Sequence, residues 1–242
     1  MTPEETALAT TGPITQLASH FMLDPATYVR GGELGFEGMN FYVAGRGGVL
    51  GQVDADVVSA GFVFFNPVAI RVAWEASLEV MAPSDSAAAF AACGHEWGRA
   101  NLPDDLDADR LAELAGKVVD AASPAGAPVF AGWRALPAPD DGKARALHHM
   151  NALRELRAAH HGAGVLTQGL MPVEAMMVAG PHMAPVFGWE EPYPDAEPCR
   201  ERWERAEAAT ILAMTTVLSV LDEQERDEFV ALAAAAHEAT SG

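Results

Sequence analysis

Basic residues are scarce in this chain of 242 residues, which carries 15 lysines and arginines against 34 acidic residues and a formal net charge of −19. Affinity for nucleic-acid phosphates comes mainly from lysine and arginine, so this shortage argues against a protein that binds duplex DNA. Nucleic acid is therefore not an expected partner. The acidic composition serves solubility and would also suit partners that carry an amine.

Cysteines and long apolar runs are also few. The two cysteines, Cys93 and Cys199, cannot build a disulfide framework. The N-terminal sequence MTPEETALATTG is acidic and lacks the apolar run of a signal peptide, and no stretch is long and apolar enough to span a bilayer. We therefore expect a cytoplasmic protein without membrane contact.

Strand signals are scarce too, because no segment sustains an alternation of apolar and polar residues and no Asn-Gly hairpin turn occurs. Hydrophobic residues make up 50% of the chain, enough for a substantial core. The predicted fold class is all-α, a multi-helix globular bundle that can include a winged-helix or helix-turn-helix part. We expect a flexible N-terminus at 1–12, a helical core domain at 13–180, a proline-rich connection at 181–199 and a C-terminal helical pair at 200–242 that packs on the core.

The least ordinary segment is 147–162, LHHMNALRELRAAHHG, which holds four of the eight histidines. Its apolar spacing predicts one helix, with Gly162 as the stop. At 3.6 residues per turn, Arg154, Arg157 and His161 project on the same side as the apolar stripe of this helix. A charged side chain on a buried face must be paired or must await an anionic ligand.

Several catalytic motifs are missing. In a helix, His148 and Glu155 lie about 10 Å apart, and His149 and His160 about 16 Å apart, which is too far to share a metal ion with bonds of ~2 Å. The glycine-rich turn GRGGVLG lacks the Lys-Ser/Thr of a phosphate-binding loop, and no Gly-x-Ser-x-Gly occurs. We expect no metal and no other cofactor.

Acid–base chemistry suits the remaining residues better. Histidine titrates near neutrality, a glutamate can orient it or act as a base, and arginines hold anions by forked hydrogen bonds. The catalytic candidates are His161, Glu155, His148 and Glu174. The substrate-binding candidates are Arg46, Arg154, Arg157, Asn151 and Tyr42. An alternative stays open, in which Arg154 and Arg157 form buried structural ion pairs with Glu155, Glu174 or other acids.

Three segments resemble an actinobacterial family of helix-turn-helix proteins without an assigned function: FYVAGRGGVLG, DADVVSAGFVFFNP and HHMNALRELRAAHHG with the Gly-Leu and Val-Glu-Ala that follow it. The resemblance runs from about residue 14 to residue 180. It places the family's polar positions on Arg46, His148, Arg154, Glu155, Arg157, His161 and Glu174. The chain departs from the family at 158–160, where Ala-Ala-His replaces Gly-Asp-Gly, so the position of His161 is less firmly matched.

In overall size the chain is also similar, more weakly, to the aziridine-forming proteins of azinomycin-type antibiotic pathways. Together with the arginine, histidine and glutamate residues, this resemblance implies a cofactor-independent small-molecule enzyme of bacterial specialised metabolism, with a His/Glu base and an arginine anion clamp. The expected reaction is ring closure by an amine that expels an anion, so the expected substrate carries both groups. The alternative is a helix-turn-helix ligand-binding protein or transcriptional regulator. A homodimer or a pathway partner protein is compatible with either function.

Overall fold

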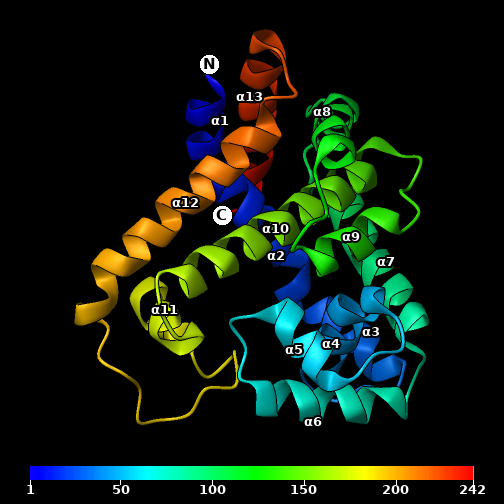
Figure 1. Ribbon diagram of the computed structural model, residues 1–242. Coiled ribbons are helices and arrows are strands. Elements are labelled where there is room, and N and C mark those ends of the chain that lie inside the picture. The colour runs from blue at the N-terminus through cyan, green and yellow to red at the C-terminus, as the bar shows by residue number, and fades with distance from the viewer. Residues whose placement is uncertain (242) are drawn as a thin grey trace.

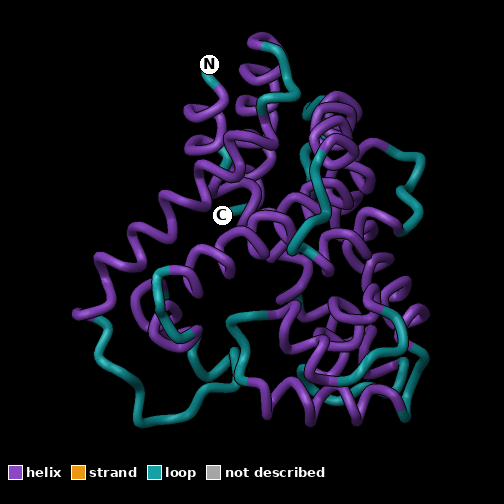
Figure 2. Tube along the Cα trace, viewed as in Figure 1, coloured by secondary structure: helices purple, strands orange, loops and turns teal. Residues whose placement is uncertain are grey.

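The computed structural model describes residues 1–241, in which helices are joined by turns and loops and no strand occurs (Figure 2). The predicted all-α class is confirmed. The α-helices are α1 (Pro3–Ala9), α2 (Thr11–Leu23), α3 (Pro25–Glu33), α4 (Asn40–Gly47), α5 (Ala55–Phe62), α6 (Pro67–Leu78), α7 (Pro83–Asn101), α8 (Ala108–Ala121), α9 (Pro128–Ala135), α10 (Gly142–Thr167), α11 (Pro172–Ala179), α12 (Arg200–Leu218) and α13 (Glu223–Thr240). Short 3₁₀ helices are η1 (Gly48–Leu50), η2 (Pro181–Met183) and η3 (Glu197–Cys199). None of the helices within residues 1–241 combines the length and apolar character needed to cross a bilayer.

Helix starts follow the capping chemistry of the sequence. Asp24 and Asn66 each accept a hydrogen bond from the backbone N–H two residues later, and a proline occupies the first helical position after each of them. Asp141 caps α10 by accepting from the N–H of Ala144. These side chains satisfy backbone donors that have no partner within the helix. Local sequence therefore sets where α3, α6 and α10 begin.

Helix α10 crosses the middle of the molecule and packs against α2, α7, α8, α9 and α12 (Figure 1). It has 26 residues, so it is about 39 Å long. Its buried residues include apolar Leu147 and Met150 and also charged Glu155 and Arg157. An ordinary core helix does not bury charges unless each has a partner. The partners of these charges define the candidate site.

The predicted helix stop at Gly162 is wrong, because α10 continues to Thr167. Gly162 instead lies where α10 meets the turn after α5. A Cβ atom built on Gly162 would lie 2.9 Å from a methyl carbon of Val63. The glycine therefore permits close approach of two segments rather than ending the helix.

Part of the N-terminal segment 1–12 is helical. Pro3–Ala9 form α1, whose start is closed by a reciprocal capping box between Thr2 and Glu5. Helix α1 packs against α12 and α13, and Figure 1 shows one end of α12 beside these two helices at the top of the view. The side chain of Arg226 donates to the backbone carbonyl of Met1. Tertiary contacts thus order residues whose own composition gave little sign of structure.

Helices α5 and α6 are joined by a turn of residues 63–66, the short connection typical of a helix-turn-helix unit. Val63 in this turn has a φ of 52°, and the N–H of Phe64 bonds to the carbonyl of Phe62 at 2.6 Å. Such a conformation is strained for a β-branched residue. Gly162 of α10 leaves room for this turn, because a Cβ atom there would clash with Val63.

Candidate functional site

The centre of the candidate site is a buried ion pair between α4 and α10. Arg46 donates from Nε and Nη2 to the two carboxylate oxygens of Glu155, each at 2.8 Å. The side chains are only 5% and 1% exposed. The guanidinium also lies over the ring of Phe62, 4.1 Å from its centroid. This forked geometry matches the strongest type of arginine–carboxylate contact.

The charges of this pair are mutually stabilised. Burial alone would raise the pKa of Glu155, but the charges and hydrogen bonds of Arg46 and Arg154 outweigh it and hold that pKa below its ordinary value. Burial likewise opposes the charged form of Arg46, and Glu155 outweighs it, so the pKa of Arg46 is raised. Glu155 is therefore a poor general base, because its proton affinity is low and both of its oxygens are engaged.

Arg154 gives this site an excess positive charge. Its Nη1 donates to Glu155 Oε1 at 2.8 Å, and its Nε donates to Ser19 Oγ at 3.1 Å. Glu155 is the only carboxylate that pairs with either Arg46 or Arg154 among residues 1–241. Two guanidinium groups thus share one carboxylate, which leaves a net charge of one unit. Arg154 is the more exposed of the two cations, with 18% of its side chain accessible.

The excess charge faces a cavity of about 170 Å³. The polar groups of its wall are the side chains of Ser19, Tyr42 and Arg154. The remaining wall is apolar and consists of Met22, Leu23, Met39, Phe65, Met183, Val186 and Phe187. An apolar cleft with a few polar groups that fix orientation is the usual form of a small-molecule site. We call this cavity the Arg154 pocket.

A second polar cluster lies within the next two turns of α10, where this helix meets α12. Arg157 Nη2 donates to Glu207 Oε2 at 2.7 Å, and His161 Nδ1 lies 3.2 Å from the other oxygen of Glu207. Burial, the largest influence, lowers the pKa of His161, while Glu207 raises it and Arg157 lowers it. The His161 ring stacks on Phe64 and meets Trp203 edge-on. We call this group the His161 cluster.

His148 and Asn151 lie in the core, away from both the Arg154 pocket and the His161 cluster. His148 Nδ1 lies 3.2 Å from His95 Nε2. Burial first, and then the neighbouring His149 and His95, lower the pKa of His148 to about 3. Neither amide atom of Asn151 has a partner among residues 1–241, and the adjacent space of about 10 Å³ could hold one water molecule. A histidine this hard to protonate is a structural core residue rather than a proton shuttle near neutrality.

Glu174 has a local role at the start of α11, where its carboxylate accepts from the backbone N–H of Met171 at 2.7 Å. The structure therefore separates the nine sequence-predicted residues. Arg46, Arg154, Glu155 and Tyr42 lie together, Arg157 and His161 form a second centre, and His148, Asn151 and Glu174 lie in neither.

Apart from Tyr42 and Arg154, the sequence did not single out the residues of the pocket wall, nor did it single out Glu207. Glu207 lies 50 residues from Arg157, so no spacing within one helix could reveal their pairing. Ser19 and the methionines of the wall occur in sequence contexts that are typical of helix and core residues. Only their convergence in three dimensions distinguishes them.

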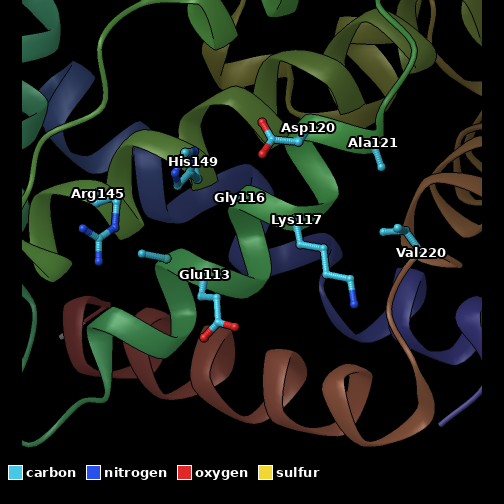
Figure 3. Close-up of a pocket in the computed structure, with 9 residues that line it drawn as sticks. Glu113, Gly116, Lys117, Asp120, Ala121, Arg145, His149 and Val220 are labelled. Atoms are coloured by element: carbon cyan, nitrogen blue, oxygen red, sulfur yellow. The ribbon is translucent and has the colours of Figure 1, made fainter.

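A larger hollow of about 810 Å³ lies between α8 and α10, and Figure 3 shows its side chains spread around the rim rather than converging. Its cations already have partners, because Lys117 pairs with Glu225 and Arg145 with Asp109. It therefore offers no uncompensated positive charge to an anionic ligand. Among residues 1–241, no three histidine, cysteine, aspartate or glutamate side chains are grouped as metal ligands would be.

Comparison with known proteins gives a family match. A model of the Helix-turn-helix family matches residues 7–197, which includes α2 to α11 and the short turn between α5 and α6. No curated protein and no solved structure matches the chain. Because the family model spans most of the 242 residues, the chain belongs to the Helix-turn-helix family.

Proposed function

We propose that this protein binds a compact organic anion in the Arg154 pocket. One observation carries the proposal: Arg46 and Arg154 share the single carboxylate of Glu155, and the unmatched positive charge lies at an apolar cavity. A buried cation without full compensation is costly, and an anionic ligand would remove that cost. The Tyr42 hydroxyl can donate a further hydrogen bond to the same ligand, whereas Ser19 Oγ already donates to the carbonyl of Thr15 and accepts from Arg154.

The size and lining of the pocket indicate one aromatic or branched aliphatic group. An engineered apolar cavity of ~150 Å³ accepts benzene, and this pocket measures about 170 Å³. The aromatic rings of Phe65 and Phe187 favour a flat group, and methionine side chains adapt to its outline. A single ring with one carboxylate, such as benzoate, matches these requirements.

The helix pair α5–α6, which has the short connection typical of a helix-turn-helix unit, does not favour a nucleic-acid ligand. Arg71, the basic residue of α6, already contacts Asp56 and Glu75. The exposed side chains of α6 include Val68 and Val72. A phosphate-binding surface needs several free lysines or arginines, which this helix does not present. The family fold therefore serves here as a scaffold for small-molecule binding, whether the protein is a ligand sensor or an enzyme.

Calorimetric titration with benzoate tests the proposal, with benzyl alcohol as the uncharged counterpart. We expect wild-type protein to bind benzoate in preference to the alcohol. Arg154→Met should weaken benzoate binding roughly 10- to 100-fold, because a hydrogen bond to a charged group contributes ~1.5–3 kcal/mol. Arg145→Met, on the same helix but paired with Asp109, should bind like wild type. Equal affinity for both probes, or unchanged binding in Arg154→Met, would contradict the proposal.

A second candidate function is cofactor-independent acid–base catalysis at the His161 cluster. The observation that favours it is a histidine whose Nδ1 side is held. Nδ1–H donates to Thr210 Oγ1 at 3.2 Å, because the Thr210 hydroxyl itself donates to the carbonyl of Ala206, and a Glu207 oxygen lies as close to Nδ1. The Nε2 atom is thereby left as a proton acceptor. Arg157 Nε and the Trp203 indole N–H are buried without partners among residues 1–241. These two donors suit the oxygens of a departing anion.

The corresponding reaction is closure of a small ring by an amine. As the nitrogen forms its bond to carbon, the carbon–oxygen bond to a sulfate breaks and the sulfate takes the electron pair. The ammonium proton passes to His161 Nε2. The pairing of cation and base in this cluster supports such chemistry, and the likeness to aziridine-forming proteins remains a prediction.

Sulfate release from 2-aminoethyl hydrogen sulfate, followed by NMR, tests this second function. Wild type should accelerate release, and His161→Gln should reduce the rate ~100-fold or more, the usual contribution of a general base. His160→Gln changes the neighbouring histidine outside the cluster and should leave the rate unchanged. No acceleration by wild type, or full activity in His161→Gln, would exclude this function.

A further inference from the structure

Residues 180–189 form a small folded unit between α11 and the loop that leads to α12. Its backbone hydrogen bonds are largely internal: the N–H of Phe187 bonds to the carbonyl of Met183 at 3.1 Å, and the N–H of Trp189 bonds to the carbonyl of Ala184 at 3.0 Å. On its C-terminal side the chain is irregular until η3, visible as the long loop at the lower left of Figure 2. This unit can therefore move as one body without breaking a helix.

The unit contacts the rest of the protein mainly at one turn. The carbonyl of Phe187 accepts from the N–H of Asn66 at 2.9 Å, and the Trp189 indole donates to the carbonyl of Phe64 at 2.8 Å. The ring of Phe187 stacks on Phe65 with centroids 4.2 Å apart. A local opening would break these two hydrogen bonds and this ring contact, together with the packing of Gly188 on Ala69 and of the buried Ala184.

The same unit supplies the outer wall of the Arg154 pocket. Met183, Val186 and Phe187 line the cavity, whereas most of the other lining residues belong to α2, α4 and α10. Displacement of 180–189 would uncover the pocket and leave Arg154 in place on α10. With residues 180–189 docked as in this structure, the Arg154 pocket has a volume of about 170 Å³.

We propose that residues 180–189 are a hinged cap that opens to admit the anion and closes over it. The proposal rests on the proposed binding function of the Arg154 pocket. Closure places Phe187 against the ligand, so this side chain limits the ligand to a single ring. Burial beneath the cap also removes the ligand from water, which strengthens its contact with Arg154.

Gly188 is the residue that lets the cap dock. Its φ is 76°, and a Cβ atom added there would lie 2.4 Å from the Cβ of Ala69 on α6. Alanine at this position would be strained and would push the cap from α6. Gly180, at the other end of the cap, offers a matched control, because its Cβ would meet nothing nearer than 3.6 Å.

The amide hydrogen of Asn66 reports cap opening directly, since its partner is the cap carbonyl of Phe187. The amide of Ile70, bonded to the carbonyl of Asn66, reports the stability of α6 itself. Hydrogen exchange of both amides is measured by NMR in wild type, Gly188→Ala and Gly180→Ala, without ligand. We expect Gly188→Ala to speed exchange at Asn66 about tenfold or more, the effect of forcing a methyl group into a packed contact. Ile70 should not change, and Gly180→Ala should match wild type.

Benzoate supplies the second arm of the experiment. At saturation it should slow exchange at Asn66 in the wild type, because the closed cap is the bound form. Unchanged Asn66 exchange in Gly188→Ala, or acceleration shared equally by Ile70, would overturn the cap. If calorimetry detects benzoate binding but Asn66 exchange does not respond to it, the ligand does not enter beneath the cap and the proposal is wrong. If benzoate does not bind at all, the proposed function fails, and the response to Gly188→Ala alone decides whether 180–189 opens.

Discussion

Replacement of Glu155 by glutamine isolates the charge that holds the buried arginines. The change keeps the shape of the side chain and removes the negative charge that Arg46 and Arg154 share. Arg46 would stay 4% exposed with a cation–π contact to Phe62 and an amide in place of a carboxylate. Breaking a buried ion pair by removing one partner costs ~3–5 kcal/mol.

For a chain of this length, that loss corresponds to a fall in melting temperature of about 6–20 °C, because ~1 kcal/mol shifts Tm by ~2–4 °C in domains of 150–250 residues. Urea titration and thermal melting followed by circular dichroism measure the change. Glu201→Gln is the control, since its pair with Arg205 is exposed and should contribute under ~1 kcal/mol.

The effect of Glu155→Gln should depend on pH in a defined direction. The pKa of Glu155 is lowered in the folded protein, so its stabilisation is complete above the unfolded pKa of ~4.3 and is lost as pH falls towards the folded value. Wild type and variant should therefore converge in strong acid. A loss below ~1 kcal/mol at pH 7 would refute the view that this carboxylate compensates a buried charge.

Two further predictions concern the core. His148 has a pKa of about 3 when folded and ~6.5 when unfolded, so it lowers stability by up to ~1.4 kcal/mol per pH unit as pH falls between these values. His148→Gln should flatten the pH dependence of urea denaturation between pH 7 and 5 by up to that amount, and an unchanged slope would show that the pKa of His148 is not lowered by folding. Gly45→Ala should destabilise the protein by ~1–3 kcal/mol in thermal melts, because the new Cβ would lie 2.3 Å from Phe90. Gly12→Ala on α2, with nothing within 4 Å, should instead stabilise it by ~0.5–1 kcal/mol, and equal effects of the two changes would count against the packing argument.

Helix positions were predictable from sequence because their causes are local. Asp24-Pro25 and Asn66-Pro67 cap and start helices by contacts with the next two or three residues. Gly162 misled this reasoning, because a helical glycine can serve close packing as well as termination, and its contact with Val63 is tertiary. The order of α1 likewise depends on contacts with the C-terminal helices.

The candidate site was predictable only in its chemistry. The buried face of α10 indicated that its arginines needed negative partners, and in the structure Arg154 pairs with Glu155 and Arg157 with Glu207. Which carboxylate serves which arginine depends on segments far apart in the chain, since Arg46 and Glu155 are separated by 109 residues. Arg46 and Arg154 share Glu155, which leaves Arg154 with unmatched charge. No spacing of residues in the sequence predicts this sharing.

The central claim is that unmatched charge on Arg154 draws an organic anion into one apolar pocket. Methyl NMR of the methionines tests it most directly, because Met22, Met39 and Met183 line that pocket among ten methionines in the chain. Benzoate should shift the methyl signals of these three in the wild type and leave them unmoved in Arg154→Met. Shifts confined to other methionines, or identical shifts in the variant, would contradict the account.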